Sequence, residues 1–165
     1  MKKTYFITRN VTVEHGTRLL NYVVDYVAIM GFGALVMGLW MMANGTDEML
    51  ESGLEMNKLE EYLLGVLFTL PYYFFLEVLT QRSLGKLITG TIVTDENGNR
   101  PSVGSILART FCRVIPFDGL SFLGNNARGW HDTISKTYVV NAKKLEADKL
   151  NFENLEKLGQ LEETP

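Results

Sequence analysis

Residues 19–42 read LLNYVVDYVAIMGFGALVMGLWMM, a run of 24 residues whose one charged side chain is Asp25. An α-helix rises about 1.5 Å per residue, so the run spans about 36 Å and can cross a bilayer core about 30 Å thick. A helix that is apolar on every side also occurs in the core of a large soluble protein, but a chain of 165 residues rarely encloses one. The run therefore predicts a membrane-spanning helix.

The start of the chain has one feature of a cleaved signal peptide, because Lys2 and Lys3 precede the apolar run. The run begins only at Leu19, however, and it is longer than the apolar region of a signal peptide. It also has no small-x-small cleavage site before Asn44. We therefore expect this helix to be retained in the membrane.

A second apolar run, YLLGVLFTLPYYFFLEVL, covers residues 62–79 and contains one acid, Glu77. Its 18 residues are close to the lower length limit of a membrane span. Pro71 lies in the middle of the run, where a membrane helix tolerates proline because neighbouring groups satisfy the freed carbonyl. The expected fold is mainly α-helical and integral to the membrane, with two transmembrane helices.

The overall net charge of -3 conceals a strongly uneven distribution of charge. Residues 1–18 carry four basic side chains against one acid, and the connector 43–61 carries six acids against one lysine. Residues 80–144 carry nine basic side chains against four acids. Because basic residues accumulate on the cytoplasmic side of membrane proteins, we expect a multi-pass protein with both termini in the cytoplasm and the acidic connector outside.

The composition also limits the function. A single cysteine, Cys112, excludes an internal disulfide, and the chain is not basic enough to suggest a nucleic-acid partner. The two histidines, His15 and His131, are too few for a metal centre of the His/Asp type. The Gly-Lys of residues 83–87 lacks the rest of a phosphate-binding loop. We therefore expect no catalytic site, no metal and no cofactor.

The cytoplasmic segment 80–142 contains two stretches with the composition of β-strands. Residues 87–93 are rich in β-branched side chains and precede the turn signal Asp95–Gly98, and residues 137–140 form the second stretch. A strand must pair with another strand, so we expect these two to form a short hairpin-like pair. The acidic tail 143–165 could form one marginal helix, but a solvated or frayed end is the simpler prediction.

Residues 102–123 repeat apolar side chains at steps of three and four, which predicts a helix. Arg109 and Arg113 lie on its other face. We expect an amphipathic helix at the membrane interface whose arginines meet anionic lipid headgroups. A third or re-entrant span and packing in a soluble domain remain as alternatives, although a span would bury both arginines.

Polar residues interrupt the two apolar helices near their cytoplasmic ends. Arg18, Asn21, Tyr22 and Asp25 share one face of the first helix, and Glu77 lies in the last turn of the second. An acid inside a span normally faces water or a partner, so these groups predict one buried polar cluster. The cluster either locks the helices together or exchanges protons or cations. Transport would require a homo-oligomer, for which Ala28, Gly31, Ala34 and Gly38 offer a close packing surface.

Four motifs over roughly residues 9–142 resemble those of the RDD family, small bacterial membrane proteins named for one arginine and two aspartates. They are Thr-Arg-Leu-Leu at 17–20, Asp25, Ser-Leu-Gly-Lys at 83–86 and Arg-Gly-Trp-His-Asp at 128–132. The resemblance implies that Arg18, Asp25 and Asp132 are the family's three positions. It also implies the bacterial inner membrane, and a transport or cation/proton exchange role has been suggested for such proteins. The long acidic connector departs from the family pattern.

Two functions therefore stand as expectations: ion or proton transport by a homo-oligomer, or a membrane scaffold whose basic segment binds lipid headgroups or a partner protein. Asp132 is expected to cap a short helix and to pair with Arg109, Arg113 or Arg128. The candidate functional residues are Arg18, Asp25, Glu77, Gly85, Lys86, Arg109, Arg113, Arg128, His131 and Asp132.

Overall fold

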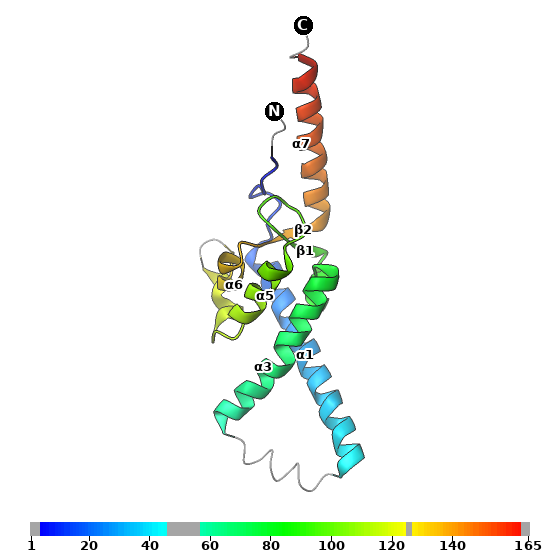
Figure 1. Cartoon of the computed structure of the whole chain (residues 1–165), viewed down its shortest axis with the longest axis vertical. Helices are drawn as coiled ribbons and strands as arrows, with labels where there is room; N and C mark the ends of the chain where they lie inside the picture. The colour runs from blue at the N-terminus through cyan, green and yellow to red at the C-terminus, as the bar shows by residue number, and fades with distance from the viewer. Residues whose placement is uncertain (1–3, 46–56, 125–126, 163–165) are drawn as a thin grey trace.

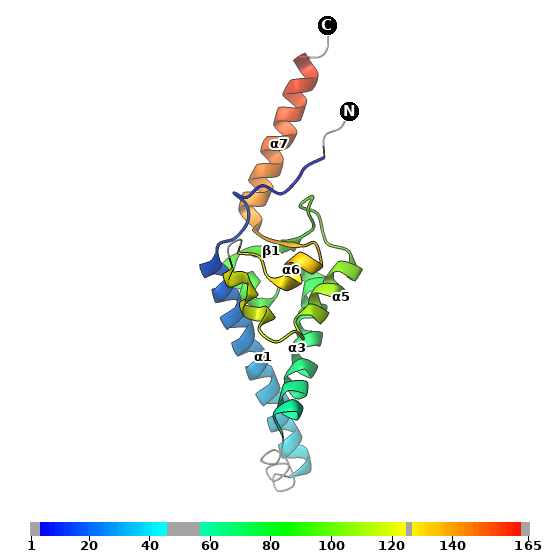
Figure 2. The same cartoon turned by 90° about the vertical axis from the view of Figure 1, so that its left-hand side faces the viewer.

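The computed structural model describes residues 4–45, 57–124 and 127–162. Two long helices, α1 (His15–Asn44) and α3 (Lys58–Thr80), extend from one end of a small central body, and α7 (Ala142–Glu162) extends from the other (Figure 1). Both chain ends lie on the α7 side, opposite the tips of α1 and α3 (Figures 1 and 2). The molecule is mainly helical, as the sequence predicts.

The two predicted spans lie inside α1 and α3. The start of α3 is stabilised by a capping box, in which the Asn57 side chain accepts from the Glu60 amide and the Glu60 carboxylate accepts from the Asn57 amide. The helix continues through Pro71 and ends where Gln81 adopts a left-handed conformation with φ 60°. Both helices are long and apolar enough to cross a membrane.

Burial in these helices is the reverse of that in a soluble protein. In the most apolar 18-residue stretch of each helix, 0% of α1 and 11% of α3 is buried. The buried residues of α1 are instead Arg18, Asn21 and Asp25. Water does not favour such an arrangement, whereas lipid covers exposed apolar side chains and polar groups turn inward. The helices therefore belong in a bilayer, and the soluble-core alternative does not fit.

The central body contains a two-stranded antiparallel sheet of β1 (Thr91–Thr94) and β2 (Tyr138–Asn141), with Ile92 opposite Val140. Residues 11–13 run along the other edge of β2, where the Asn141 amide donates to the Val11 carbonyl at 2.9 Å. Valines from these three segments form two small apolar clusters, one of Val11 and Val140 with Leu145 and the other of Val13, Val93 and Val139. The predicted pairing of two strands is confirmed.

The prediction of a strand over residues 87–93 is wrong for its first half, because residues 84–89 form the short helix α4 (Leu84–Thr89). Ser83 precedes the helix in an extended conformation, and Gly90 ends it with φ 67°. Glycine adopts this left-handed conformation without steric cost, so it stops the helix and starts the strand. The apolar, β-branched composition of residues 87–93 hid this boundary.

The predicted helix 102–123 is two helices. The first is α5 (Val103–Cys112), and the second is a single 3₁₀ helix, η1 (Asp118–Leu123). Pro116 lies between them and cannot continue an α-helix. A further short helix, α6 (Trp130–Ile134), follows and leads into β2.

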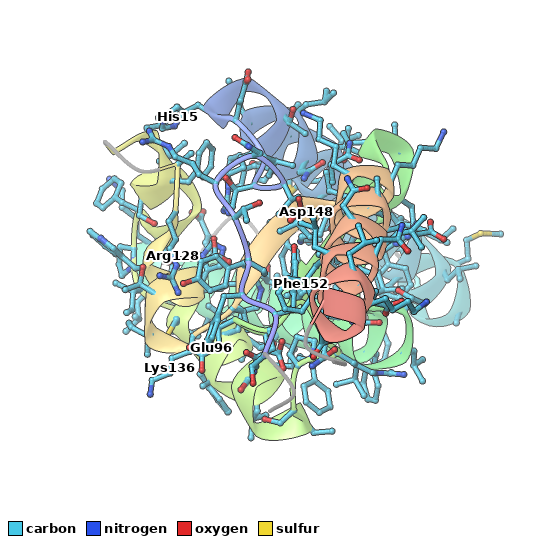
Figure 3. The ribbon with its side chains drawn as sticks, turned by 90° about the horizontal axis from the view of Figure 1, so that it is seen from above. His15, Glu96, Arg128, Lys136, Asp148 and Phe152 are labelled. Carbon is cyan, nitrogen blue, oxygen red and sulfur yellow. The ribbon has the colours of Figure 1, made fainter. Side chains whose placement is uncertain are left out.

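The prediction of a frayed tail is wrong over residues 142–162, which form α7. Its first turns pack on the N-terminal segment: Leu145 joins Val11 and Val140, and the Tyr5 hydroxyl donates to Asp148 at 2.7 Å. Figure 3 looks down on this end, with Asp148 and Phe152 of α7 beside the N-terminal segment. Residues 46–56, which hold most of the acidic connector, lie outside the described residues.

Candidate functional site

Seven charged side chains from five helices or the residues beside them form a buried ionic network where α1 and α3 meet the central body. Their side chains are at most 9% exposed where they form ion pairs. Charges are costly to bury unless each one has a partner, and six of the seven form ion pairs, while Asp25 is held by uncharged donors. The network consists of Arg18, Asp25, Glu77, Lys86, Arg109, Arg113 and Asp132.

Glu77, in the last turn of α3, is fully buried and faces three basic side chains. Its carboxylate lies 3.0 Å from Lys86 Nζ, 2.9 Å from Arg109 Nε and 3.4 Å from an Arg113 terminal nitrogen. The guanidinium of Arg113 also lies over the ring of Tyr73, 3.6 Å from its centroid. Glu77 therefore fastens α3 to both α4 and α5.

Arg109 joins the two halves of the network because it contacts two acids at once. It donates to Glu77 and Asp132, and its third bond goes to the Thr137 hydroxyl at 2.9 Å. Burial opposes the charge of Arg109, but Asp132 and Glu77 outweigh burial and raise its pKa. Arg109 is thus a charged residue at the centre of the fold.

Asp132 connects α6 to α1 and α5. Its carboxylate accepts from Arg18 and Arg109, and it also accepts from the Gly129 amide at 3.2 Å, which caps α6. Burial alone would raise the pKa of Asp132, but Arg109, His131 and Arg18 hold it well below its usual range. The expected cap is confirmed, and of the three expected arginine partners the one that pairs with the carboxylate is Arg109.

Asp25 differs from the other two acids because every group that donates to it is uncharged. Three hydroxyls contact its carboxylate, those of Tyr72 at 2.8 Å, Tyr73 at 3.3 Å and Ser83 at 2.6 Å. The fourth donor is the Gly85 amide at 2.7 Å. Within residues 4–45, 57–124 and 127–162, no basic nitrogen forms an ion pair with Asp25.

Asp25 is nevertheless linked to the rest of the network. Ser83 donates to Asp25 and accepts from Lys86 Nζ at 3.2 Å, and Lys86 contacts Glu77. Burial lowers the pKa of Lys86, and the attraction of Glu77 opposes this effect. The two membrane acids thus belong to one polar cluster, as the sequence predicts, with Ser83 and Lys86 between them.

The backbone of α4 touches the backbone of α1 at Gly85. A Cβ at this position would meet the Asn21 carbonyl oxygen and would lie 2.9 Å from Asn21 Cα. The amide and hydroxyl groups of the two segments also pair, since Thr89 Oγ1 donates to Asn21 Oδ1 at 2.6 Å. Only glycine permits this approach, and the approach brings the Gly85 amide to Asp25.

The structure thus brings Arg18, Asp25, Glu77, Gly85, Lys86, Arg109, Arg113 and Asp132 together. The two remaining candidates lie beside the network. His131 Nδ1 is 2.6 Å from Asp118, and Arg128 donates to the main-chain carbonyls of Asp132 and Thr137. Arg128 also stacks on Tyr138, 4.2 Å from the ring centroid.

The predicted orientation of α5 is wrong. Arg109 and Arg113 do not face lipid headgroups, because Arg109 is fully buried and both arginines contact Glu77. The apolar side chains of Val103, Leu107 and Phe111 are the exposed ones, at 58%, 43% and 58%. The buried acids Glu77 and Asp132 would be unpaired without these arginines, which costs more than the loss of contacts to lipid headgroups. The charged face of α5 therefore turns inward.

The sequence predicts no contact in the site for four residues that the structure places there: Tyr72, Tyr73, Ser83 and Asp118. One signal was present in the spacing, since Tyr73 lies four residues before Glu77 and therefore on the same helix face. Nothing in the sequence marks Ser83 as a donor to Asp25 or Asp118 as the partner of His131.

The lowered pKa of His131 predicts how the stability of the fold depends on pH. Burial lowers its pKa from 6.5 to about 4, so between these values the unfolded chain binds a proton that the folded protein does not. Lowering the pH through this window is therefore expected to destabilise the fold, by up to about 1.4 kcal/mol per pH unit. Thermal unfolding in detergent from pH 7 to pH 4 measures the effect.

The variant that isolates this contribution is His131→Gln, which is expected to flatten the profile in the window. The exposed His15, changed to Gln, is the matched control and should keep the wild-type profile. If the profiles of His131→Gln and wild type run parallel between pH 6.5 and pH 4, His131 is not the cause.

Two hollows border the network. A cavity of about 40 Å³ lies inside it, and a larger pocket of about 350 Å³ lies between α1, α3 and the segment 113–120. Tyr22, Tyr73, Arg113 and Gly119 line both. The ring of Tyr22 packs so closely on Gly119 that a Cβ there would lie 2.5 Å from it.

Comparison with known proteins supports the motif pattern. A family model described as the RDD family matches residues 12–139, from the segment beside β2 through to β2 itself. The matched range contains the whole ionic network and leaves α7 outside. No curated protein and no solved structure matches the chain.

Proposed function

This chain belongs to the RDD family, and on that premise we propose that it is a multi-pass protein of the bacterial inner membrane that moves protons or small monovalent cations. Asp25 is the carboxylate that exchanges the ion. The remaining charged groups hold α1, α3 and the central body in position around it.

The observation that carries the proposal is the environment of Asp25. It is 2% exposed and lies on a membrane helix, yet its partners are hydroxyls and one amide. Glu77 and Asp132, by contrast, each contact at least two basic side chains. A carboxylate held by a permanent cation already has its charge matched, whereas one held by neutral groups has no bound charge that an incoming cation must displace.

The oxygens around Asp25 also suit an alkali cation. Its two carboxylate oxygens lie within 3.3 Å of three hydroxyl oxygens, from Tyr72, Tyr73 and Ser83. Hard cations prefer oxygen ligands of this kind. A hydroxyl that donates to the carboxylate when the site is empty can turn its lone pairs to a cation when the site is filled.

The shape of the molecule supports the proposed orientation. Both chain ends lie at the same end, with α7 and the central body (Figures 1 and 2). The basic segments 1–18 and 80–144 belong to this end, and basic residues favour the cytoplasmic side. In this orientation Asp25 lies in the inner half of the bilayer, next to the cytoplasmic body.

Transport by this chain requires a homo-oligomer, since two spans alone do not enclose a path. The face of α1 that holds Gly31 and Gly38 is available for packing, because a Cβ at either position would meet nothing within 4 Å. Small residues let membrane helices approach closely. The scaffold function keeps the exposed basic side chains Arg100, Lys136, Lys143 and Lys144 but loses Arg109 and Arg113, which are engaged by Glu77.

Asp25→Asn is expected to abolish ion-coupled proton movement. The amide keeps the size of the side chain, and its oxygen can still accept from the Tyr72 hydroxyl and the Gly85 amide, whereas its NH2 group cannot accept from Tyr73 and Ser83. It carries no charge and binds neither a proton nor a cation at neutral pH. The measurement uses purified protein in proteoliposomes with a pH-sensitive dye inside, under an imposed sodium or potassium gradient. Wild type should change the internal pH faster than empty vesicles, and Asp25→Asn should match empty vesicles.

Glu153→Gln is the matched control, because it removes one carboxylate from the exposed surface of α7. It should transport like wild type. Folded yield in detergent separates the two roles of Asp25: a transport site predicts normal yield with lost flux, and a structural lock predicts low yield. Wild-type vesicles that show no flux above empty ones, or Asp25→Asn vesicles as active as wild type, would overturn the proposal.

A further inference from the structure

We propose that residues 111–123 dip into the bilayer beside α1 and α3 as a re-entrant segment, and that the apolar face of this segment contacts lipid acyl chains. The segment comprises the end of α5, the turn that follows it, and η1. It enters and leaves the bilayer on the side of the central body. This placement does not depend on ion movement at Asp25.

Contacts with α3 show that the chain descends along this helix toward its start. Arg100 donates to the carbonyl of Leu79, at the end of α3, at 3.2 Å. The carbonyl of Val114 accepts from the hydroxyl of Tyr62, near the start of α3. The stretch of α3 between Leu79 and Tyr62 is about 26 Å long. The turn after α5 therefore lies beside the part of α3 that crosses the membrane.

After this turn the chain returns along α1 toward the central body. Gly119 packs against the ring of Tyr22. The carbonyl oxygen of Phe122 lies 2.8 Å from Nδ1 of His15, the first residue of α1. The segment thus forms a hairpin that points toward the tips of α1 and α3 (Figure 2).

The pocket of about 350 Å³ fixes the depth of this hairpin. Residues 113–120 line the pocket together with residues between 22 and 29 of α1 and between 62 and 73 of α3. These neighbours belong to the apolar runs 19–42 and 62–79, which cross the bilayer. The hairpin therefore lies at the depth of the hydrocarbon core and not above it.

The surface of the hairpin suits lipid. The structure describes all of residues 111–123, and every exposed residue among them is apolar. The two charged side chains turn inward, Arg113 to Glu77 and Asp118 to His131. An exposed apolar patch marks an interaction site, and this one continues the lipid-facing surface of α3. The exposed residues are Phe111, Ile115, Pro116, Phe117, Leu120 and Leu123.

The turn also satisfies its own backbone, which a bilayer requires of any segment inside it. The amides of residues 113, 114, 115 and 118 each donate to the carbonyl three residues earlier, at 3.0–3.2 Å. Pro116 has no amide hydrogen to satisfy. Phe117, at the tip of the hairpin, is 77% exposed, and transfer of its ring from water to acyl chains is favourable.

Lipid contact is tested with a tryptophan at the tip of the hairpin. Phe117→Trp is made in a chain whose two tryptophans, Trp40 and Trp130, are changed to phenylalanine. The protein is reconstituted in vesicles of phosphatidylcholine that is brominated on its acyl chains, or in plain vesicles with iodide on both sides. Bromine quenches tryptophan on contact, so Phe117→Trp should lose most of its emission to brominated lipid and little to iodide.

Two variants in the same background serve as controls. Leu67→Trp, at a position of α3 that is 64% exposed, should be quenched by brominated lipid, and Leu150→Trp, at a position of α7 that is 57% exposed, by iodide. Phe117→Trp should behave like Leu67→Trp. If it behaves like Leu150→Trp, the hairpin faces water, and if neither quencher reaches it, a second copy of this chain covers the face. Either result would overturn the proposal.

Cysteine labelling provides a second test with a smaller side chain. Phe117→Cys and Leu150→Cys are each combined with Cys112→Ala, so that each chain has one thiol. In nanodiscs, whose two faces are open to solvent, a charged maleimide should label Leu150→Cys and leave Phe117→Cys unlabelled, whereas in SDS it should label both. Equal labelling in nanodiscs would contradict the placement, even if Phe117→Trp failed to fold. Neither test measures flux, so both are independent of the proposed ion exchange.

Discussion

Replacing Arg109 with methionine is expected to lower the free energy of unfolding by about 3–5 kcal/mol. Methionine fills most of the space of the aliphatic stem but leaves Glu77 and Asp132 without the cation they share. Both acids are fully buried, so neither can recover the loss by contact with water. Removing one partner of a buried ion pair costs far more than the pair itself contributes. Glu77 keeps Lys86 and Arg113, and Asp132 keeps Arg18, but both buried acids lose one cation.

Unfolding of purified protein in mixed micelles, followed by the near-ultraviolet signal of its tryptophans, measures this effect. The exposed Arg9, changed to methionine, is the control and should stay within about 0.5 kcal/mol of wild type. The double variant Arg109→Met with Glu77→Gln should be less stable still, since Lys86 and Arg113 then lose the acid that they contact. A loss in Arg109→Met no larger than that in Arg9→Met would show that the network does not stabilise the fold.

The second large effect is expected at Gly85, where an alanine should cost about 3 kcal/mol and abolish transport. Its Cβ would meet the backbone of Asn21, which cannot move as a flexible side chain can. Overpacking against backbone costs about 1–3 kcal/mol, and moving α4 away from α1 also breaks the bond from the Gly85 amide to Asp25. One added methyl group would thus move the Gly85 amide of α4 away from the Asp25 carboxylate of α1.

Gly104 is the matched control, because it lies in α5 and a Cβ there would find its nearest atom, Ser102 Oγ, at 3.8 Å. Alanine at this position should be neutral or stabilise the helix by up to about 1 kcal/mol. Thermal unfolding in detergent and proton flux in vesicles are measured for both variants. If Gly85→Ala and Gly104→Ala behave alike in both assays, the close approach of α4 to α1 has no role in the site.

The spans were predictable because length and hydropathy are local properties. Residues 19–42 and 62–79 lie inside α1 and α3, and no packing partner is needed to recognise 24 or 18 apolar residues. The second part of the strand 87–93 and the strand 137–140 were found for the same reason. The boundary at Gly90 was missed because an apolar run of this length fits both a helix and a strand.

The members of the site were also largely predictable, since charged residues near membrane spans are few. Their partners were not. Asp132 had three expected arginine partners, and the structure gives it Arg109 together with Arg18, which lies in the first turn of α1, 114 residues earlier. Sequence spacing relates residues on one helix face, but it carries no information about which face of another helix lies opposite.

The sequence alone determined that this protein places two helices in a membrane, that its charges divide into basic and acidic segments, and that polar groups gather near one end of the spans. Only the tertiary structure decided that Arg109 and Arg113 point inward and that Asp25 is held by uncharged donors. The physical reason lies in the surroundings of each helix. An amphipathic pattern defines two faces, but the solvent on one side and the acids on the other decide which face is buried.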